Sequence, residues 1–411
     1  MGYYTDVIKD LQWAVMEIQE NGILLDKELC SHYHKIASTR RLELRQQLSD
    51  ALGYDFNPNS PKQVMNLFNS DFLITLKDSS DELSILKLCI KVPEAKPIAE
   101  TIIEYRAVGK LASTYLEPDV WHDGRVRSQF RVYGTLTWRL SSREPNLQNL
   151  PRSEAYGINV RSIYCAPPGK VLVEFDKMQL EARIPAYASR CTKQIKRFEN
   201  GEDLYSVLAY VVSGSIVKNK KDPIRYNAKQ FKLADGYGAS AHKVSDTMLL
   251  NTGLWFEPFV VSRWQEAMRA DTPEIYTWFN ECWAYANKHK KLVEGFGVPR
   301  LLYGKPDDLR QVAYSWPTQA TASGILNRVL VRIWRFMQSQ KGTWWDQVKI
   351  ICQLHDSLLF EVPTGYLNKF LPKTKELMDE PVTIFGYTCV LPSEAKIGER
   401  WGEMKEVVIP G

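Results

Sequence analysis

The chain has 411 residues, which is too many for one simple hydrophobic core and suits two or three subdomains. Hydrophobic residues make up 44% and charged residues 25%, the profile of an ordinary soluble globular protein. The net charge of +5 is a mild basic excess, which is compatible with a polyanionic partner but does not require one.

The cysteines argue against two kinds of fold. The seven of them form no CxxC pair and no ligand-spaced cluster, so neither a disulfide framework nor structural zinc is expected. A reducing, intracellular compartment is the simplest interpretation. No apolar run approaches the roughly 20 residues that span a bilayer, and the N-terminal segment has no cleavage-site pattern. We therefore expect no membrane partner and no signal peptide.

Residues 1–115 are predicted to be mostly helical. Helix-like spacing relates the first apolar residues, which are Val7, Leu11, Val15, Ile18 and Ile23. A second helix is predicted over 28–53, ending at a glycine, and a long one over 93–116, entered through prolines. A helical arm of this size could grip a duplex, although a solvated helical bundle explains the same pattern.

The next segments alternate between strand and helix character. Three strands are predicted within 126–134, 157–166 and 170–178, separated by Gly, Pro and Asn turns. The chain is expected to be helical from about 186 to 315, and strand character returns from 347 to 362. This order predicts one sheet that is interrupted in sequence by a helical insertion.

Two aspartates, 180 residues apart, lie in or at the end of apolar, β-prone runs. Asp176 occurs in VLVEFDKMQLEAR and Asp356 in IICQLHDSLLFEV. Strands distant in sequence can lie side by side, and the two carboxylates would then meet and repel unless a cation lies between them. Hard oxygen ligands suit Mg²⁺. The pattern therefore predicts a paired-carboxylate metal site for phosphoryl or nucleotidyl transfer.

A second constellation lies in the segment RYNAKQFKLADGYG. Arg225, Lys229, Leu233 and Tyr237 recur at every fourth position, which would place them on one face of an α-helix that Gly238 closes. Two cations one turn apart suit a triphosphate, and an aromatic ring further along could lie beside a base. A charged helix face bathed in water is the alternative that this pattern leaves open.

A third constellation is the polar loop over 134–152. Its turn formers are combined with side chains that can donate to phosphate and sugar oxygens and to the minor-groove edges of bases. These side chains are Arg139, Ser141, Ser142, Asn146, Gln148, Asn149 and Arg152.

Together these segments resemble one family. GTLTWRLSSREPNLQNLP, DKMQLEAR, RYNAKQFKLADGYG and QLHDSLLFEV are similar to the signature motifs of family A DNA polymerases, the bacterial DNA polymerase I group, in the family's order and spacing. The resemblance implies an α+β right-hand fold with a helical thumb, an antiparallel-sheet palm and helical fingers. The implied parts are the thumb and N-terminal helical region (1–115), the first part of the palm (116–190), the fingers (191–315), and the second part of the palm with the C-terminus (316–411).

The resemblance also implies an activity and its residues. The chain would be a template-directed DNA polymerase of replication or repair, acting as a monomer on primer-template DNA and dNTPs in a bacterial or phage-infected cell. Asp176, Asp356 and Lys229 would be catalytic. Two Mg²⁺ ions, replaceable by Mn²⁺, would bind the two aspartates and the backbone carbonyl of Lys177.

The remaining implied roles concern substrate contacts. The dNTP would contact Arg225, Lys229, Leu233, Tyr237, Glu181, Gln179, Lys177 and Tyr205. DNA would contact Arg139, Asn146, Gln148, Asn149, Arg183, Gln319, His355, Ser113, Thr114 and Tyr115. Glu181 matches the residue that blocks a ribose 2′-hydroxyl, so deoxynucleotides should be preferred.

Some residues depart from the family pattern. Leu233 replaces a phenylalanine or tyrosine, Ser357 a glutamate beside the second aspartate, and Tyr205 a phosphate-binding histidine. These departures are typical of a divergent, phage- or plasmid-borne lineage. Residues 1–115 are too few to hold a proofreading exonuclease domain beside the thumb, so none is expected there.

Two alternatives remain, of which the first is another enzyme and the second belongs to a different functional class. A single-subunit RNA polymerase has a related palm and fingers, but Glu181 argues against it, because a barrier to the 2′-hydroxyl is useless to such an enzyme. A degenerate polymerase that only binds nucleic acid is the other alternative. Retention of both aspartates, Arg225, Lys229 and Tyr237 argues against that one.

Overall fold

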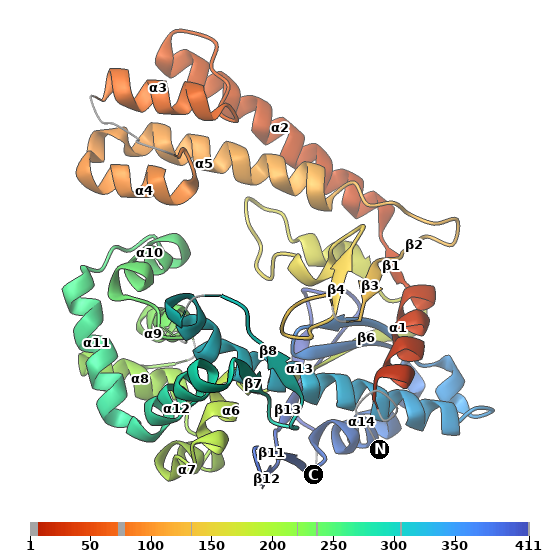
Figure 1. The fold of residues 1–411 in the computed structure, drawn as a ribbon. Helices are drawn as coiled ribbons and strands as arrows, with labels where there is room; N and C mark the ends of the chain where they lie inside the picture. The colour runs from red at the N-terminus through yellow and green to blue at the C-terminus, as the bar shows by residue number, and fades with distance from the viewer. Residues whose placement is uncertain are drawn as a thin grey trace. The chain divides into compact units, whose positions relative to one another are not determined.

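The computed structural model describes residues 7–72, 79–132, 134–219, 221–235, 237–304 and 306–409. The chain divides into two compact units, which we describe separately (Figure 1). The first unit comprises Met1–His34, Thr114–Arg190 and Trp278–Gly411, and the second comprises Lys35–Ser113 and Cys191–Thr277. In the described ranges, no helix has the length and apolarity needed to cross a membrane.

The first unit is organised around a five-stranded antiparallel sheet in the order β14-β13-β6-β10-β9. The strands are β6 (Lys170–Lys177), β9 (Lys349–Leu354), β10 (Ser357–Pro363), β13 (Ser393–Gly398) and β14 (Lys405–Val407). The centre of the sheet thus joins a segment near residue 170 to segments beyond residue 340, as the sequence predicts.

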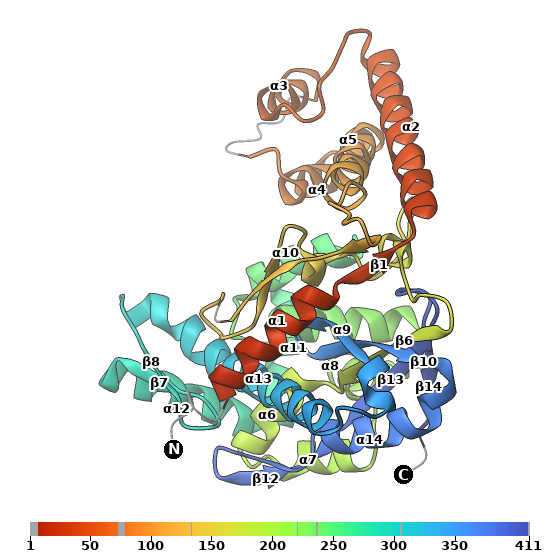
Figure 2. The ribbon, with the colours of Figure 1, turned by 90° about the vertical axis from the view of Figure 1, so that its right-hand side faces the viewer.

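One face of this sheet is apolar. Because side chains alternate along a strand, Phe175 of β6 points to the opposite face from its neighbours Glu174 and Asp176. Phe175 packs edge-on against Phe360 of β10, and both rings contact Phe370 of α14 (Leu367–Asp379), a helix that lies against this face (Figure 2). All three phenylalanines are fully buried, so the polar face of β6 rests on a rigid apolar layer.

Further elements of the first unit surround the sheet. The helices are α1 (Lys9–Asn21), which packs against β9, α6 (Leu180–Ala188) and α13 (Pro306–Ser339), together with the C-terminal part of α12 (Pro273–His289). The smaller sheets contain β1 (Ile23–Leu25), β2 (Arg125–Val126) and β5 (Tyr164–Cys165), then β3 (Gln129–Arg131) with β4 (Ser141–Arg143), β7 (Lys291–Val293) with β8 (Pro299–Leu301), and β11 (Val382–Ile384) with β12 (Tyr387–Cys389).

Every complete secondary-structure element of the second unit, within its described residues, is helical. Its helices are α2 (Lys27–Leu52) from Lys35 onward, α3 (Pro61–Asp71), α4 (Glu82–Lys91), α5 (Lys96–Lys110), α7 (Thr192–Glu199), α8 (Leu204–Ser213), α9 (Pro223–Asp235), α10 (Ala241–Thr252) and α11 (Pro258–Asp271). Side-chain caps begin several of them. Asp203 accepts a hydrogen bond from the Ser206 amide at the start of α8, and Ser240 accepts one from the Lys243 amide at the start of α10.

Two apolar clusters hold these helices. The first cluster contains Phe56 and Phe68 and packs helices α2, α3, α4 and α5 together. Helices α2 and α5 lie side by side (Figure 1). Arg40 on α2 also forms a 2.7 Å ion pair with Glu104 on α5. A second cluster around Phe231 joins α8, α9, α10 and α11. Helix α9 is thus a packed element that presents one face outward.

Several predicted boundaries differ from the structure. Ile23, predicted on the first helix, lies in β1, because that helix ends at Asn21 and Gly22 takes a positive φ of 54°. The hairpin β7–β8 interrupts the region predicted as helical up to 315. Tyr237 lies beyond α9, which ends at Asp235, so the face of that helix carries Arg225, Lys229 and Leu233 but not the tyrosine.

The apolar layer behind the sheet predicts a stability effect. Replacing Phe360 by alanine should lower the free energy of unfolding by about 3–5 kcal/mol, because it leaves a cavity between the two partner rings. Urea denaturation followed by circular dichroism measures this change. The control is Val408→Ala, at a side chain 93% exposed, which should leave the value nearly unchanged. Equal stability of both variants would contradict the packing role.

Candidate active site

The two predicted carboxylates meet at the end of the β6–β10 pair. Ser357 lies opposite Asp176 in the register, and Asp356 directly precedes Ser357 in the turn between β9 and β10. The Lys177 amide donates a 3.0 Å hydrogen bond to the Asp356 carbonyl oxygen. The prediction that these aspartates share one sheet is therefore confirmed.

The electrostatics of this pair are unfavourable without a cation. The Oδ1 atoms of Asp176 and Asp356 are both buried without a hydrogen-bond partner. Burial, reinforced by the negative charges of Asp356 and Glu174, raises the pKa of Asp176 to about 8. Arg152 Nη2 lies 3.7 Å from Asp356 Oδ1, but its side chain is 66% exposed and screened by water. The two oxygens therefore favour a proton or a metal ion.

The donor set fits magnesium better than zinc. In the described ranges, no three or more His, Cys, Asp or Glu side chains gather into a metal site. Mg²⁺ retains several waters and is commonly held through one or two carboxylates, which matches the two unbonded oxygens. Lys177 could contribute only its backbone, because its buried Nζ donates to the carbonyl oxygens of Met378 and Leu391.

The residues that follow β6 include three for which the sequence predicts substrate contacts. Gln179 adopts a left-handed conformation with φ of 51° at the start of α6, and its Oε1 is buried without a partner. Glu181, on the first turn of α6, accepts a hydrogen bond from Arg139. Arg183 is buried and donates to the Met178 carbonyl oxygen at 3.0 Å.

His355 lies beside Asp356 in the same turn. Its burial, together with the positive charge of Arg139, lowers the pKa of the imidazole, which is therefore neutral at pH 7. Its Nδ1 atom is buried without a hydrogen-bond partner. A neutral ring with an unsatisfied nitrogen can accept or donate a bond to a ligand group at this position.

The polar loop divides into inward and outward side chains. Gln148 is buried and donates to the carbonyl and side-chain oxygens of Gln353 on β9, both at 3.0 Å. Its amide therefore fixes the loop to the sheet. Asn146 and Asn149 are exposed, and the Asn149 carbonyl oxygen accepts a 3.3 Å bond from Tyr115.

The other predicted DNA-contacting residues are distributed between both units. Gln319 is half-buried on α13. Ser113 and Thr114 are exposed on the π-helical turn Leu111–Tyr115 that follows α5, and the two belong to different units.

The second unit carries the predicted cationic face. Asp203 holds Arg225 through two hydrogen bonds of 2.7 Å, to its Nε and Nη2 atoms. The Tyr205 ring lies against both cations. Its centroid is 5.3 Å from the Arg225 Cζ atom and 5.9 Å from the Lys229 Nζ atom. Leu233, one turn further along, is 51% exposed. Arg225 and Lys229 thus lie one turn apart on α9, and the ring beside them is that of Tyr205 rather than the predicted Tyr237.

Sequence reasoning missed Asp203 and Glu174 at these two places, and it named Arg152 only as a donor of the polar loop. The only sequence signal for Asp203 is its position two residues before Tyr205, and that spacing alone does not indicate a contact with Arg225. Burial raises the pKa of Asp203, but hydrogen bonds from Arg225 and Ser206 outweigh this effect and lower it. Glu174 precedes Asp176 by two residues on one strand face. Arg152 belongs to the polar loop already singled out.

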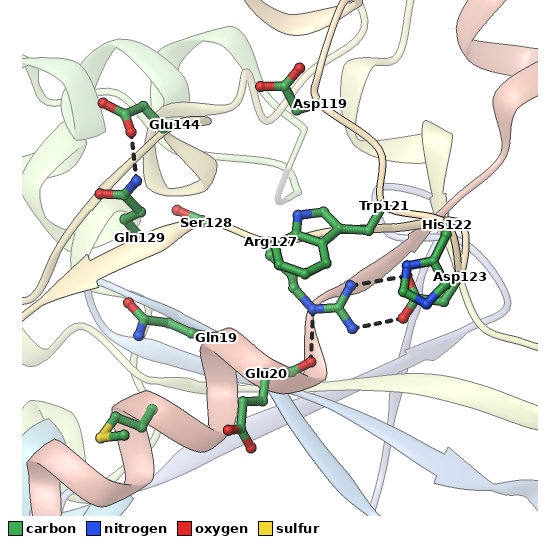
Figure 3. A pocket seen from close by; sticks show the side chains of 11 residues that line it. Gln19, Glu20, Asp119, Trp121, His122, Asp123, Arg127, Ser128, Gln129 and Glu144 are labelled. Atoms are coloured by element: carbon green, nitrogen blue, oxygen red, sulfur yellow. Dashed lines mark hydrogen bonds and ion pairs between the residues drawn. The ribbon is translucent and has the colours of Figure 1, made fainter.

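A cavity of about 700 Å³ lies in the first unit beside α1 (Figure 3). The guanidinium of Arg127, which lines this cavity, donates to both Asp123 carboxylate oxygens and to the Glu20 carbonyl oxygen. It also lies 4.7 Å from the centroid of the Trp121 ring. Among the described residues, its lining includes none that the sequence analysis assigned to a site. Its main cation is already paired, so we do not place the active site there.

Comparison with known proteins identifies the family. The family model for DNA polymerase family A matches residues 27–403, so the chain belongs to that family. DNA polymerase I, thermostable, of Thermus aquaticus is 25% identical over 98% of this chain and 48% of its own length. DNA polymerase I of Borreliella burgdorferi is 25% identical over 95% of this chain and 43% of its own length. The chain thus spans about half the length of the curated relatives it matches.

A solved structure confirms the fold class. The POL domain of Pol1 from M. smegmatis, in a complex with DNA primer-template and dNTP, superposes with a TM-score of 0.86 at 22% identity. The match covers 96% of this chain and 70% of that one. The predicted α+β right-hand polymerase fold is therefore correct.

The raised pKa of Asp176 predicts a pH dependence of stability. Without metal, the native state binds one more proton than the unfolded state between about pH 4 and pH 8, so the free energy of unfolding should fall as pH rises through this window. Asp176→Asn should remove this part of the slope. Urea denaturation in chelator at several pH values measures it, and identical slopes for both proteins would contradict the shift.

Proposed function

We propose that the chain is a template-directed DNA polymerase that adds deoxynucleotides to a primer 3′-hydroxyl. The observation that carries this proposal is the convergence of Asp176 and Asp356, whose buried Oδ1 atoms lack a hydrogen-bond partner. Membership of family A supports it. Buried carboxylates without a partner destabilise a fold, so their convergence here is better explained by a function than by stability.

The two aspartates would hold two Mg²⁺ ions, with the Lys177 backbone carbonyl as a further ligand and Mn²⁺ as a possible substitute. The bound ions would supply a lowered pKa for the primer hydroxyl and charge neutralisation at the leaving group. The 3′-oxygen would attack the α-phosphorus, forming a phosphodiester bond. The bond to the β-phosphate would break, and pyrophosphate would leave while the hydroxyl proton passes to solvent.

The cationic face of α9 would bind the triphosphate. Arg225 and Lys229 are one turn apart and contact the same Tyr205 ring, which limits their movement. Lys229 would also neutralise or protonate the leaving pyrophosphate. Leu233 and Tyr237 would lie near the base and sugar, where the leucine offers an aliphatic surface in place of a ring.

Nucleotide selection would depend on the first turn of α6. Glu181 would exclude a ribose 2′-hydroxyl, and its hydrogen bond from Arg139 fixes the carboxylate in place. Gln179 would lie beside the same sugar. A carboxylate at this position is the feature that argues against the RNA polymerase alternative.

The DNA contacts would be of two kinds. Outward amides of Asn146 and Asn149, with the guanidinium group of Arg139, would follow the minor groove, and Arg183 would lie close by. Other contacts with the primer-template would come from Gln148, Gln319, His355, Ser113, Thr114 and Tyr115. The hydrogen bonds from Gln148 to Gln353 would also hold the loop in place for these contacts.

We also propose a monomer in a reducing, cytoplasmic setting, which the seven free cysteines support. The proposed division into thumb and N-terminal region (1–115), palm (116–190 and 316–411) and fingers (191–315) follows the family resemblance.

Asp356→Ala should abolish primer extension, by at least about a thousandfold, because one of two metal-holding carboxylates is lost. Extension of a labelled primer with Mg²⁺ and dNTPs measures activity, and a gel shift measures duplex binding, which should persist. Asp119→Ala, at an exposed carboxylate of the same unit, should behave as wild type. Normal extension by the Asp356 variant would contradict the proposal, and duplex binding without extension by the wild type would favour the nucleic-acid-binding alternative.

Asp203→Asn should raise the KM for dNTP roughly 5- to 20-fold with a smaller change in kcat, because Arg225 loses the charge-assisted bonds that hold it. Steady-state incorporation of a single dNTP measures both constants. Glu266→Gln, at an exposed acid of the same unit, is the matched control. An unchanged KM would show that Arg225 does not depend on Asp203 for its position.

A further inference from the structure

Glu174 is a third acidic residue beside the carboxylate pair. It precedes Asp176 by two positions on β6, and residues two apart on a strand point to the same face of the sheet. The neighbouring strand β10 pairs Leu359 with Glu174 and Ser357 with Asp176. Glu174 therefore lies on the same face of the sheet as Asp176, one strand repeat away.

Both oxygens of Glu174 are already held. The Ser357 hydroxyl donates to Oε1 at 2.8 Å, and the Trp401 indole N–H donates to Oε2 at 3.3 Å. Ser357 and Trp401 are each only 1% exposed, and the Arg161 guanidinium stacks over the Trp401 ring at 4.6 Å. The carboxylate of Glu174 is thus fixed in one orientation.

The contrast with the two aspartates is informative. The Oδ1 atoms of Asp176 and Asp356 are buried without a hydrogen-bond partner, whereas each oxygen of Glu174 accepts a hydrogen bond from a buried side chain. A carboxylate tethered in this way still attracts a divalent cation through space. Residues that hydrogen-bond around metal ligands commonly set the ligand geometry and the affinity.

We propose that Glu174 is a positioning residue for the carboxylate pair. It anchors Ser357, the residue next to Asp356, and places a third negative charge beside Asp176 without binding the ion itself. This inference rests on the proposed function, since it assumes that the two aspartates hold divalent ions.

A purely structural role is the competing explanation, in which Glu174 only satisfies two buried donors. Glu174→Gln separates the two explanations. The glutamine Oε1 can accept from Trp401 while its Nε2 donates to the Ser357 oxygen, so the shape and both hydrogen bonds remain and only the charge is lost.

The test is Mn²⁺ binding to the full chain, measured by electron paramagnetic resonance of the free ion. Glu174→Gln should weaken Mn²⁺ affinity on the order of tenfold, with an unchanged metal-free unfolding midpoint. Glu406→Gln, which removes an exposed acid from β14 of the same sheet, should bind as wild type. Wild-type affinity in Glu174→Gln would overturn the inference.

A second variant keeps the test independent of folding defects in the first. The double exchange Glu174→Ser with Ser357→Glu returns a carboxylate to the same region from β10, because the two side chains are in direct contact. It should restore Mn²⁺ affinity to within about threefold of wild type, and should also restore the Mg²⁺ dependence of primer extension. An exchange that binds no better than Glu174→Gln would overturn the charge argument.

Failure of this inference can be distinguished from failure of the proposed function. Asp176→Asn, measured in the same way, should lose Mn²⁺ binding. If it does so while Glu174→Gln retains wild-type affinity, only the role of Glu174 is rejected. If Asp176→Asn itself binds as wild type, the carboxylate site is rejected and the proposed function loses its central observation.

Discussion

The antiparallel pairing of β6 with β10 is the constraint on which the site depends. It runs from Ser357–Asp176 to Pro363–Lys170 without interruption. A slip of one residue would turn Asp176 toward the apolar face and Phe175 toward the polar one. The buried phenylalanine layer therefore fixes the register, and the register fixes where the carboxylates meet.

Different parts of the sheet supply stability and form the site: one face packs the core, and the site lies at one end of the β6–β10 pair. On its apolar face, Phe175, Phe360 and Phe370 supply packing. Toward the other end of β10 from the site, buried Glu361 is neutralised by Arg125 at 2.7 Å and Lys170 at 2.9 Å. The Oδ1 atoms of Asp176 and Asp356 lack such hydrogen-bonded partners. A stable sheet can tolerate this local cost, as functional sites commonly require.

Much of this arrangement could be predicted from sequence. The strand patterns around Asp176 and Asp356 were sufficient to expect one sheet. The four-residue spacing between Arg225 and Lys229 was sufficient to expect both on one helix face. Tyr237 was misplaced because the spacing pattern continues beyond the point where α9 ends at Asp235. Sequence periodicity carries no information about where a helix loses its packing partners.

Contacts made only by the fold could not be predicted. Trp401 reaches Glu174 across 227 residues of chain, and Gln148 reaches Gln353 across 205. In the sequence, Gln148 was indistinguishable from the exposed Asn146 and Asn149, since all three are amides in one polar loop. Their different roles follow from which of them lies over β9, a property of tertiary packing alone.

The most direct test of the account is the position of a divalent ion. Crystals of the chain soaked with Mn²⁺ would reveal the ion by its anomalous scattering. The account predicts a peak within ligand distance, about 2.0–2.3 Å, of carboxylate oxygens from both Asp176 and Asp356. A fully occupied Mn²⁺ site elsewhere, with these two carboxylates bonded only to protein groups or water, would contradict it.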